Sequence, residues 1–317
     1  MGYVQLINFQ KFMKKFCLFL ALAGIALIGC NKEPSDTLMR VKTIKLFLST
    51  EETKTVNDGM STKWKTGDKV ILHYAPTGTT GYLKGVDGTG KAEVTDTDRG
   101  VFEADLPSEL DANSYYDWWV FYPFNSNVKP DKTNGIVIGC AHNKSQTQEG
   151  NNSMSHLAGS TGFPLYGSTK NVLATDYPSI VMRNVASVLE YKVTNKLSED
   201  ITITGIDITA PNDLVGYWYV NYSGDEISCT ATQASRVSKT AKLVINNADA
   251  IHAGETAFYY IGVAPSRLIS GGEVSISITA SNGTTTGTHN TSIVLSKDID
   301  LVAGKITTLE VNYNTTF

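Results

Sequence analysis

The stretch Thr43-Ile44-Lys45-Leu46-Phe47-Leu48 is the first part of the chain in which apolar residues follow a fixed period. Its aliphatic residues, Ile44, Leu46 and Leu48, occupy every second position. Successive side chains of a β-strand point to opposite faces of its sheet, so an alternation of period two predicts a strand with one buried face. Lys69–Tyr74 shows the same alternation and predicts a second strand.

Segments of similar character continue through the rest of the chain. Tyr115–Tyr122 is a strongly aromatic candidate strand that ends before Pro123, and Ile136–Ile138 is a shorter one. Turn residues separate the candidates of the second half by roughly 8–15 positions, the spacing of a β-sandwich or barrel. These candidates are Ser179–Met182, Ser187–Thr194, Ile201–Ala210, Tyr217–Val220, Lys242–Ile245, Thr256–Val263, Glu273–Thr279, Thr291–Leu295 and Lys305–Tyr313. No long segment has a helical period, so the sequence predicts an all-β fold.

Residues 141–175 interrupt this pattern. They are rich in Asn, Ser, Gln, Thr and Gly and have little periodicity, so we expect a long crossover loop with one helical turn near Ser155–Ala158. A chain of 317 residues suits two domains better than one. We therefore predict an N-terminal β-sandwich domain at 41–175, with the crossover loop at its end, and a C-terminal β-sandwich domain at 176–317.

The N-terminus has the anatomy of a secretory signal. Lys14 and Lys15 precede the apolar run Phe16–Ile28, which is shorter than the ~20 residues of a comfortable membrane span. The segment Leu27-Ile28-Gly29-Cys30 resembles a lipobox, the signal at which a cysteine is acylated and becomes the new N-terminus. The sequence predicts a signal peptide at 1–29, and the alternative is a plain signal peptide with an incidental cysteine.

Cys30 is then the lipidation site, and residues 30–40 form a polar, lipidated tether. Several acyl chains on one residue are sufficient for stable attachment to a bilayer. Asn31-Lys32-Glu33 resembles the short charged signal with which some Bacteroidetes lipoproteins reach the cell surface. We therefore expect the protein in the outer membrane, exposed on the surface of the cell.

The charge of the chain limits its partners. It has 27 basic and 31 acidic side chains, and three of the lysines, Lys11, Lys14 and Lys15, lie in the predicted signal. The remaining 24 basic groups against 31 acidic ones give the mature part a net charge of −7. Nucleic acid is repelled by an acidic surface and is not expected as a partner.

The residues that commonly carry chemistry form no recognisable site. The five histidines have no metal-ligand spacing, and no serine lies in a G-x-S-x-G elbow. Gly85–Ala92 resembles a phosphate-binding loop but has Ala92 where Ser or Thr would bind Mg²⁺. Cys140 and Cys229 could form one disulfide or remain unpaired. We expect no enzyme activity, no cofactor and no metal.

Two groups of aromatic residues are the candidates for contact with a ligand or a partner. Trp118 and Trp119 lie in the first candidate domain, and Tyr217 and Trp218 lie in the second. Exposed aromatic rings stack on sugars or on apolar partner surfaces. The alternative is a central strand packed on both faces, in which these rings belong to the core.

Several short segments, taken in order, resemble the fimbrillin family of Bacteroidetes, the lipoprotein precursors of type V pili and their relatives. Each segment is short, and their order and spacing carry the resemblance, which covers most of the mature chain. The segments are Thr62–Val70 with its W-x-x-G-D core, Gly100-Val101-Phe102, Tyr116–Pro123, Gln146-Thr147-Gln148, Ala186–Asn195 and Ala303–Thr307.

The resemblance implies two transthyretin-like β-sandwich domains and a structural or adhesive role in a pilus, as an anchor, tip or accessory subunit. Its partners would be other pilus subunits, joined by strand addition, together with outer-membrane lipid and a host protein or glycan. The alternative is a glycan-binding surface lipoprotein that is not part of a pilus, using the aromatic residues above.

The resemblance also implies a protease site, because pilus-forming members are cut after an arginine and lose their first strand. Arg40 is the candidate here, although a cut so close to Cys30 would remove only the tether. Arg99 lies in what reads as a turn, Thr97-Asp98-Arg99-Gly100, and is the weaker candidate.

Overall fold

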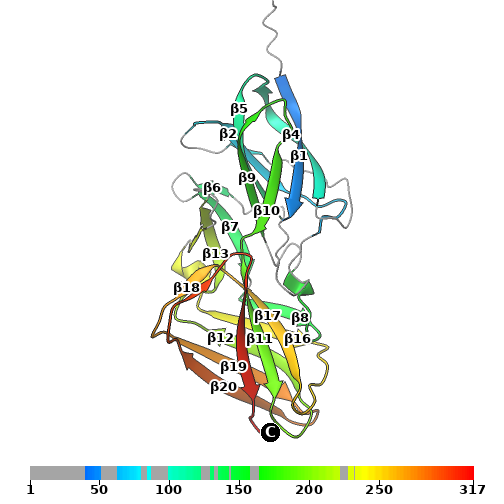
Figure 1. Cartoon of the computed structure of the whole chain (residues 1–317), viewed down its shortest axis with the longest axis vertical. Helices are drawn as coiled ribbons and strands as arrows, with labels where there is room; N and C mark the ends of the chain where they lie inside the picture. Colours follow the sequence, from blue (N-terminus) through cyan, green and yellow to red (C-terminus); the bar gives the residue numbers. More distant parts are fainter. Residues whose placement is uncertain are drawn as a thin grey trace, which may run out of the picture. The chain divides into compact units, whose positions relative to one another are not determined.

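The computed structural model describes residues 40–50, 63–79, 84–86, 99–122, 129–131, 135–142, 144–157, 164–221, 228–231 and 233–317. The predicted signal peptide and Cys30 lie outside these residues. The described part consists of strands β1 to β22 and two short 3₁₀ turns, without an α-helix (Figure 1). The fold is all-β, as the alternation of the sequence predicts.

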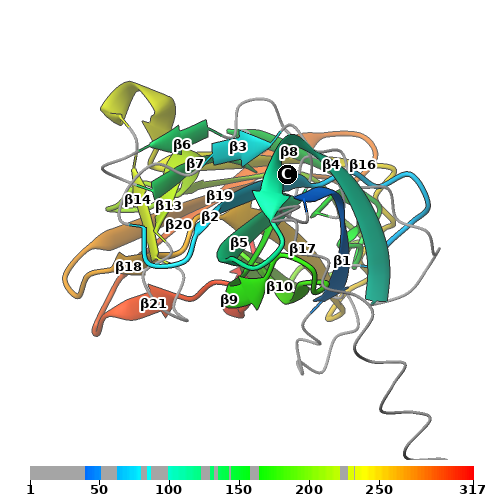
Figure 2. The ribbon, with the colours of Figure 1, turned by 90° about the horizontal axis from the view of Figure 1, so that it is seen from above.

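The strands nearest the N-terminus form a seven-stranded sheet. Its order can be followed in Figure 2 and is β3 (Lys84–Val86), β2 (Ile71–Pro76), β5 (Tyr115–Tyr122), β9 (Leu165–Leu173), β10 (Ser179–Asn184), β1 (Arg40–Thr50) and β4 (Arg99–Asp111). β1 runs parallel to β10 and antiparallel to β4. The strands expected around residues 43–48, 69–74 and 115–122 are all present.

This sheet closes around its own core. Tyr74 of β2 places its hydroxyl 3.3 Å from the hydroxyl of Ser108 in β4, although the two strands lie far apart in the strand order. The Trp64 ring, just before β2, meets the rings of Phe102 and Tyr122 edge-on at 5.0 and 5.1 Å between centroids. Trp64 is fully buried, so its large apolar surface contributes strongly to this core.

The second half of the chain forms a β-sandwich. One layer is a five-stranded sheet ordered β20 (Thr286–Val294), β19 (Glu273–Ser281), β12 (Thr202–Thr209), β16 (Thr240–Asn246) and β8 (Ser145–Glu149). The other layer has three strands, β17 (Thr256–Val263), β11 (Ser187–Asn195) and β22 (Ile306–Tyr313). Tyr191 of β11, Ile206 of β12 and Ile276 of β19 belong to the same buried cluster, which fills the space between the layers.

Two smaller sheets complete the described fold. A five-stranded sheet contains β14 (Ser228–Ala231), β13 (Val215–Asn221), β7 (Gly135–His142), β6 (Lys129–Asp131) and β15 (Val237–Ser238). β18 (Ser266–Leu268) and β21 (Ile299–Leu301) form a two-stranded ribbon. The 3₁₀ turns are η2 (Ser155–Leu157) and η3 (Ala234–Arg236).

The segment predicted as a crossover loop differs from that expectation. The helical turn is present as η2, but residues 141–175 also contain β8 and β9. β7 and β8 pair with β13 and β16 of the second half, whereas β10 returns to the sheet of β1. The division at residue 175 stays a prediction, and strand pairing crosses that position in both directions.

Candidate strand-pairing site

Strand β1 occupies a slot between two neighbours of its own chain. Residues 47–50 pair in parallel with β10, and the strand pairs with β4 over most of its length. Ile44, Leu46 and Leu48 are the inward side chains, and each is at most 2 % exposed. An apolar side chain of this size gains about 1.5–3 kcal/mol when it is buried. The slot therefore selects an extended segment with apolar residues at alternate positions.

The two arginines considered for proteolysis lie at the starts of strands. Arg40 is the exposed first residue of β1 and stands opposite Asp111 of β4. The pKa of Asp111 is lowered chiefly by hydrogen bonds from the Asn113 backbone and the Ser114 hydroxyl, with a smaller contribution from the Arg40 charge. Arg99 is the first residue of β4, paired with Ser49, and does not lie in a turn as predicted. Its Asp-Arg-Gly context resembles a turn in sequence, but pairing with β1 holds it extended.

One edge of the C-terminal sandwich is closed by side-chain amides. The outward backbone groups of β17, which a further strand would normally bind, are bound by Gln146, Gln148 and Asn152. The Gln146 carboxamide accepts from Gly262 N at 2.9 Å and donates to Gly262 O at 2.7 Å. Tyr260 N donates to Gln148 Oε1 at 3.0 Å. We call these three side chains the amide ladder.

Asn152 completes the amide ladder. Phe258 N donates to Asn152 Oδ1 at 2.8 Å, while Asn152 N donates to Phe258 O at 2.9 Å. Asn152 has a φ of 60°, a left-handed conformation that Asn adopts more readily than most residues. Gln148 is fully buried, and its amide also donates to Gly150 O at 2.9 Å. The pattern Gln146-Thr147-Gln148 is part of the family resemblance, but nothing in the sequence indicates that these side chains close a strand edge.

Strand β20 lies at the end of the five-stranded sheet opposite to β8, and within the described part of the chain its edge is not covered as that of β17 is. It pairs with β19 over all nine residues, and among the described residues it has no partner on its other side. Most of its side chains are exposed, and Val294 is 66 % exposed. The backbone groups along this edge are therefore open to water or to another strand.

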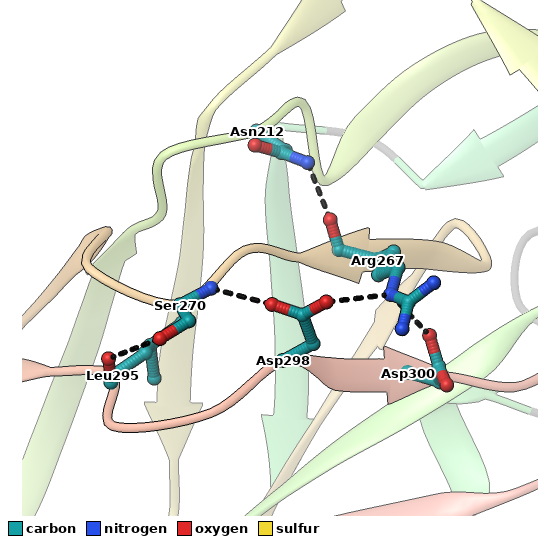
Figure 3. Close-up of polar contacts among 6 residues, drawn as sticks. All are labelled: Asn212, Arg267, Ser270, Leu295, Asp298 and Asp300. Carbon is teal, nitrogen blue, oxygen red and sulfur yellow. Dashed lines mark hydrogen bonds and ion pairs between the residues drawn. The ribbon is translucent and has the colours of Figure 1, made fainter.

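A polar network holds the chain where β20 ends (Figure 3). Arg267 of β18 contacts Asp298 at 3.1 Å and Asp300 at 3.4 Å, and Asp298 also accepts from Ser270 N at 2.8 Å. The Asn212 amide donates to the backbone oxygen of Arg267 at 2.5 Å. The three charged side chains are more than a third exposed, so each ion pair contributes at most about 1 kcal/mol. The network positions loops and forms no reactive site.

The four aromatic residues predicted to contact a ligand or partner differ in how far they are buried. Trp118, Trp119 and Trp218 are 0, 8 and 5 % exposed, so a ligand cannot reach the faces of their rings. The strand that carries Trp118 and Trp119 is packed on both faces, because the two rings belong to different buried clusters. Tyr217 is 41 % exposed, with the Arg236 guanidinium 5.9 Å from its ring centroid. Direct contact with a partner is possible at Tyr217 and not at the three tryptophans.

The described residues offer no group of three or more His, Cys, Asp or Glu side chains that could hold a metal ion. Cys229 is a free, half-buried thiol, and the side chain of Cys140 lies outside what the structure describes. His156 lies against the Tyr260 backbone oxygen at 3.0 Å, and burial lowers its pKa. In the part of the chain that is described, no helix has both the length and the apolar character to cross a bilayer.

Comparisons with known proteins give a likeness of fold. No protein-family model and no curated protein matches this chain. A candidate cell adhesion protein from Bacteroides ovatus matches with a TM-score of 0.51 at 10 % identity, covering 86 % of this chain and 92 % of that one. A candidate cell adhesion protein from Bacteroides uniformis is 15 % identical over 88 and 94 % of the two chains, with a TM-score of 0.47. A fimbrial assembly protein from Parabacteroides distasonis is 11 % identical over 86 and 91 %, with a TM-score of 0.42.

Proposed function

We propose that this protein is a fimbrillin-like cell-surface lipoprotein, a structural or adhesive subunit of a type V pilus that acts by strand pairing with other subunits. The observation that carries the proposal is the slot of β1, a buried strand position between β10 and β4. The fold likeness to a candidate cell adhesion protein and the ordered fimbrillin-like segments support the same conclusion.

The chemistry of the slot suits strand exchange. An incoming segment would form backbone hydrogen bonds with β4 and β10 and would place apolar side chains where Ile44, Leu46 and Leu48 now lie. Backbone pairing supplies affinity in such complexes, and the alternate pockets supply specificity. This pairing needs no reactive side chain.

The position of Arg40 favours a subunit that keeps its lipid. Since Arg40 is the first residue of β1, a cut after it would remove the tether and leave Val41–Thr50 in the slot. A cut after Arg99 would instead separate β1, β2 and β3 from the rest of the chain. An intact, lipidated chain would serve as an anchor, tip or accessory subunit in the outer membrane, and its own β1 would have to leave the slot before a partner strand could enter.

The test is to determine the N-terminus of the protein recovered from cells. We expect a blocked, acylated Cys30, and Cys30→Ala should release the protein from the membrane fraction. An N-terminus at Val41 or Gly100 would contradict a lipid-retaining subunit. Electron microscopy of a deletion strain tests the pilus itself, and surface fibres unchanged in number and length would contradict this role.

The alternative function, glycan binding outside a pilus, has fewer available residues. Trp118, Trp119 and Trp218 are buried, so a sugar would have to stack on Tyr217. A Tyr217→Ala chain that loses binding to a glycan array, with fibres unchanged in the deletion strain, would favour this alternative.

A further inference from the structure

The edge strands of the described sheets differ in how well they are protected from pairing with another chain. β4 carries Pro107 and several acidic residues, and β6 is three residues long with Pro130 at its centre. β8 is short and ends at Glu149, while β22 carries the exposed Glu310. Short length, proline and charge are the usual means by which proteins prevent edge-to-edge association. β17 lacks these features but is closed by the amide ladder.

β20 has none of these protections. Its nine residues, Thr-Gly-Thr-His-Asn-Thr-Ser-Ile-Val, include no proline, lysine, arginine, aspartate or glutamate. Thr, Ile and Val favour extended structure. The side chains of Thr288, Asn290 and Ser292, on the face of β20 away from the sandwich core, are exposed. A second strand could therefore approach without displacing packed side chains.

The strand is held in place before any partner arrives. His289 lies on the inner face of β20, where its Nδ1 is 2.9 Å from the Thr315 hydroxyl and its ring is 5.5 Å from that of Tyr313. Burial lowers the pKa of His289 and so favours its neutral form. The ring of Phe317 lies against Gly287. An ordered edge loses little conformational entropy when it pairs.

Charge indicates which partner this edge accepts. The whole chain has a net negative charge, with 31 acidic and 27 basic side chains, so two copies carry like net charge. β20 is a long surface strand without charge, where two copies can meet without placing like charges opposite each other. A two-fold axis through the middle of the strand would bring the same uncharged residues together from both chains.

We infer that β20 is a self-association site, at which two copies of this chain pair antiparallel and join their five-stranded sheets into one continuous sheet. The inference goes beyond the proposed function and does not depend on it, because it rests on the β20 edge and not on the slot of β1. Residues directly opposite each other in such a pair have Cα atoms about 4.5–5.5 Å apart, which is within the range of a disulfide.

Cysteine scanning of the full chain in intact cells tests the inference. Each residue from Thr288 to Ser292 is replaced by Cys in turn, and non-reducing gels are used to detect a dimer after mild oxidation. We expect one position, at the two-fold axis, to give a dimer at least about tenfold more abundant than in the parent chain. The parent chain controls for the native cysteines. Absence of a dimer at all five positions would overturn the inference.

Ser275→Cys is the matched control, because Ser275 is exposed on the next strand, β19, opposite Ser292. It carries the same thiol on the same sheet but away from the edge. If the Ser275→Cys dimer were as abundant as the best β20 dimer, the crosslinks would be explained by random collisions between chains, and the inference would be overturned.

A charge swap supplies a second measurement that does not depend on oxidation. Asn290→Lys should weaken co-purification of two differently tagged full chains by roughly tenfold, because like charges would face each other near the axis. Mixing Asn290→Lys with Asn290→Glu should restore it. If Asn290→Lys left co-purification unchanged, any self-association would occur at a surface other than β20, which would contradict the inference.

Discussion

Two edge strands of the C-terminal sandwich, β17 in one layer and β20 in the other, have the same kind of backbone but lie in opposite environments. At β17 the outward N–H groups of Phe258 and Gly262 donate to side chains of the amide ladder, and the Gly262 C=O accepts from one of them. At β20 no described residue binds them. The comparison teaches that an edge can be closed without another strand, since carboxamides carry the donor and the acceptor of a peptide group. The fold therefore determines which strands lie at an edge, but the neighbouring side chains determine whether that edge is open.

The largest effect should follow from removing the centre of the amide ladder. Gln148→Ala deletes the acceptor for Tyr260 N and leaves buried backbone groups without partners. We expect a loss of about 3 kcal/mol in the free energy of unfolding, measured by urea denaturation. Thr147→Ala, at the exposed neighbour on β8, should change it by less than about 0.5 kcal/mol. Equal effects of the two substitutions would contradict the role given to the ladder.

Hydrogen exchange should distinguish the two edges directly. The amides of Phe258, Tyr260 and Gly262 are hydrogen-bonded to the ladder and should exchange about a hundredfold more slowly than the outward amides of β20. The measurement is made by NMR on the Asn290→Lys chain, in which self-pairing is disfavoured. Similar rates at both edges would mean that the ladder opens freely in solution.

Acid should weaken the closed edge through His156. Burial lowers the pKa of its imidazole in the folded protein, so the unfolded chain takes up a proton first as the pH falls below about 6.5. This histidine therefore makes the protein less stable between pH 7 and 5, and His156→Gln should reduce that slope in thermal unfolding. His252 is the control with the opposite sign, because a hydrogen bond to Asp200 raises its pKa. Its contribution to stability is present below the unfolded pKa and is lost as the pH rises through the folded value. A slope unchanged by His156→Gln would refute the assignment.

The smallest effect on folding is expected at the open edge. Asn290 is exposed and Asn290→Lys removes no described hydrogen bond, so the free energy of unfolding should change by less than about 0.5 kcal/mol. Calorimetry at low protein concentration measures this change without a contribution from association. A loss above about 1 kcal/mol would mean that Asn290 supports the fold of the single chain.

Alternation predicted the strands that bury apolar side chains. Tyr115–Tyr122 and Thr256–Val263 have the same bounds in the structure as in the sequence prediction. β8 was predicted as a loop because its residues, Ser-Gln-Thr-Gln-Glu, are polar. Its pairing with β16 joins residues about a hundred positions apart, and Gln148 is buried by hydrogen bonding and not by hydrophobicity. The sequence of such a strand contains no local pattern that would predict it.

The candidate site was predicted only in part. Composition indicated the aromatic residues, but it cannot say which side of a strand is covered by another sheet, and three of the four rings are in the core. The lack of charge in β20 is visible in the sequence, whereas its position at the edge of a sheet depends on pairing with β19 alone. Whether a strand lies at the edge of a sheet therefore depends on the assembled fold and cannot be predicted from the strand's own sequence.

The parallel pairing of β11 with β22 has a consequence for how the molecule is made. Val188 lies opposite Ile306 and Asn195 opposite Tyr313, so the central strand of one layer waits for a partner synthesised more than a hundred residues later. Proteins dominated by such distant pairings have a high contact order and fold slowly. Residues 306–313 must have left the ribosome before this layer of the sandwich can form. Until then this layer of the sandwich lacks one of its edge strands.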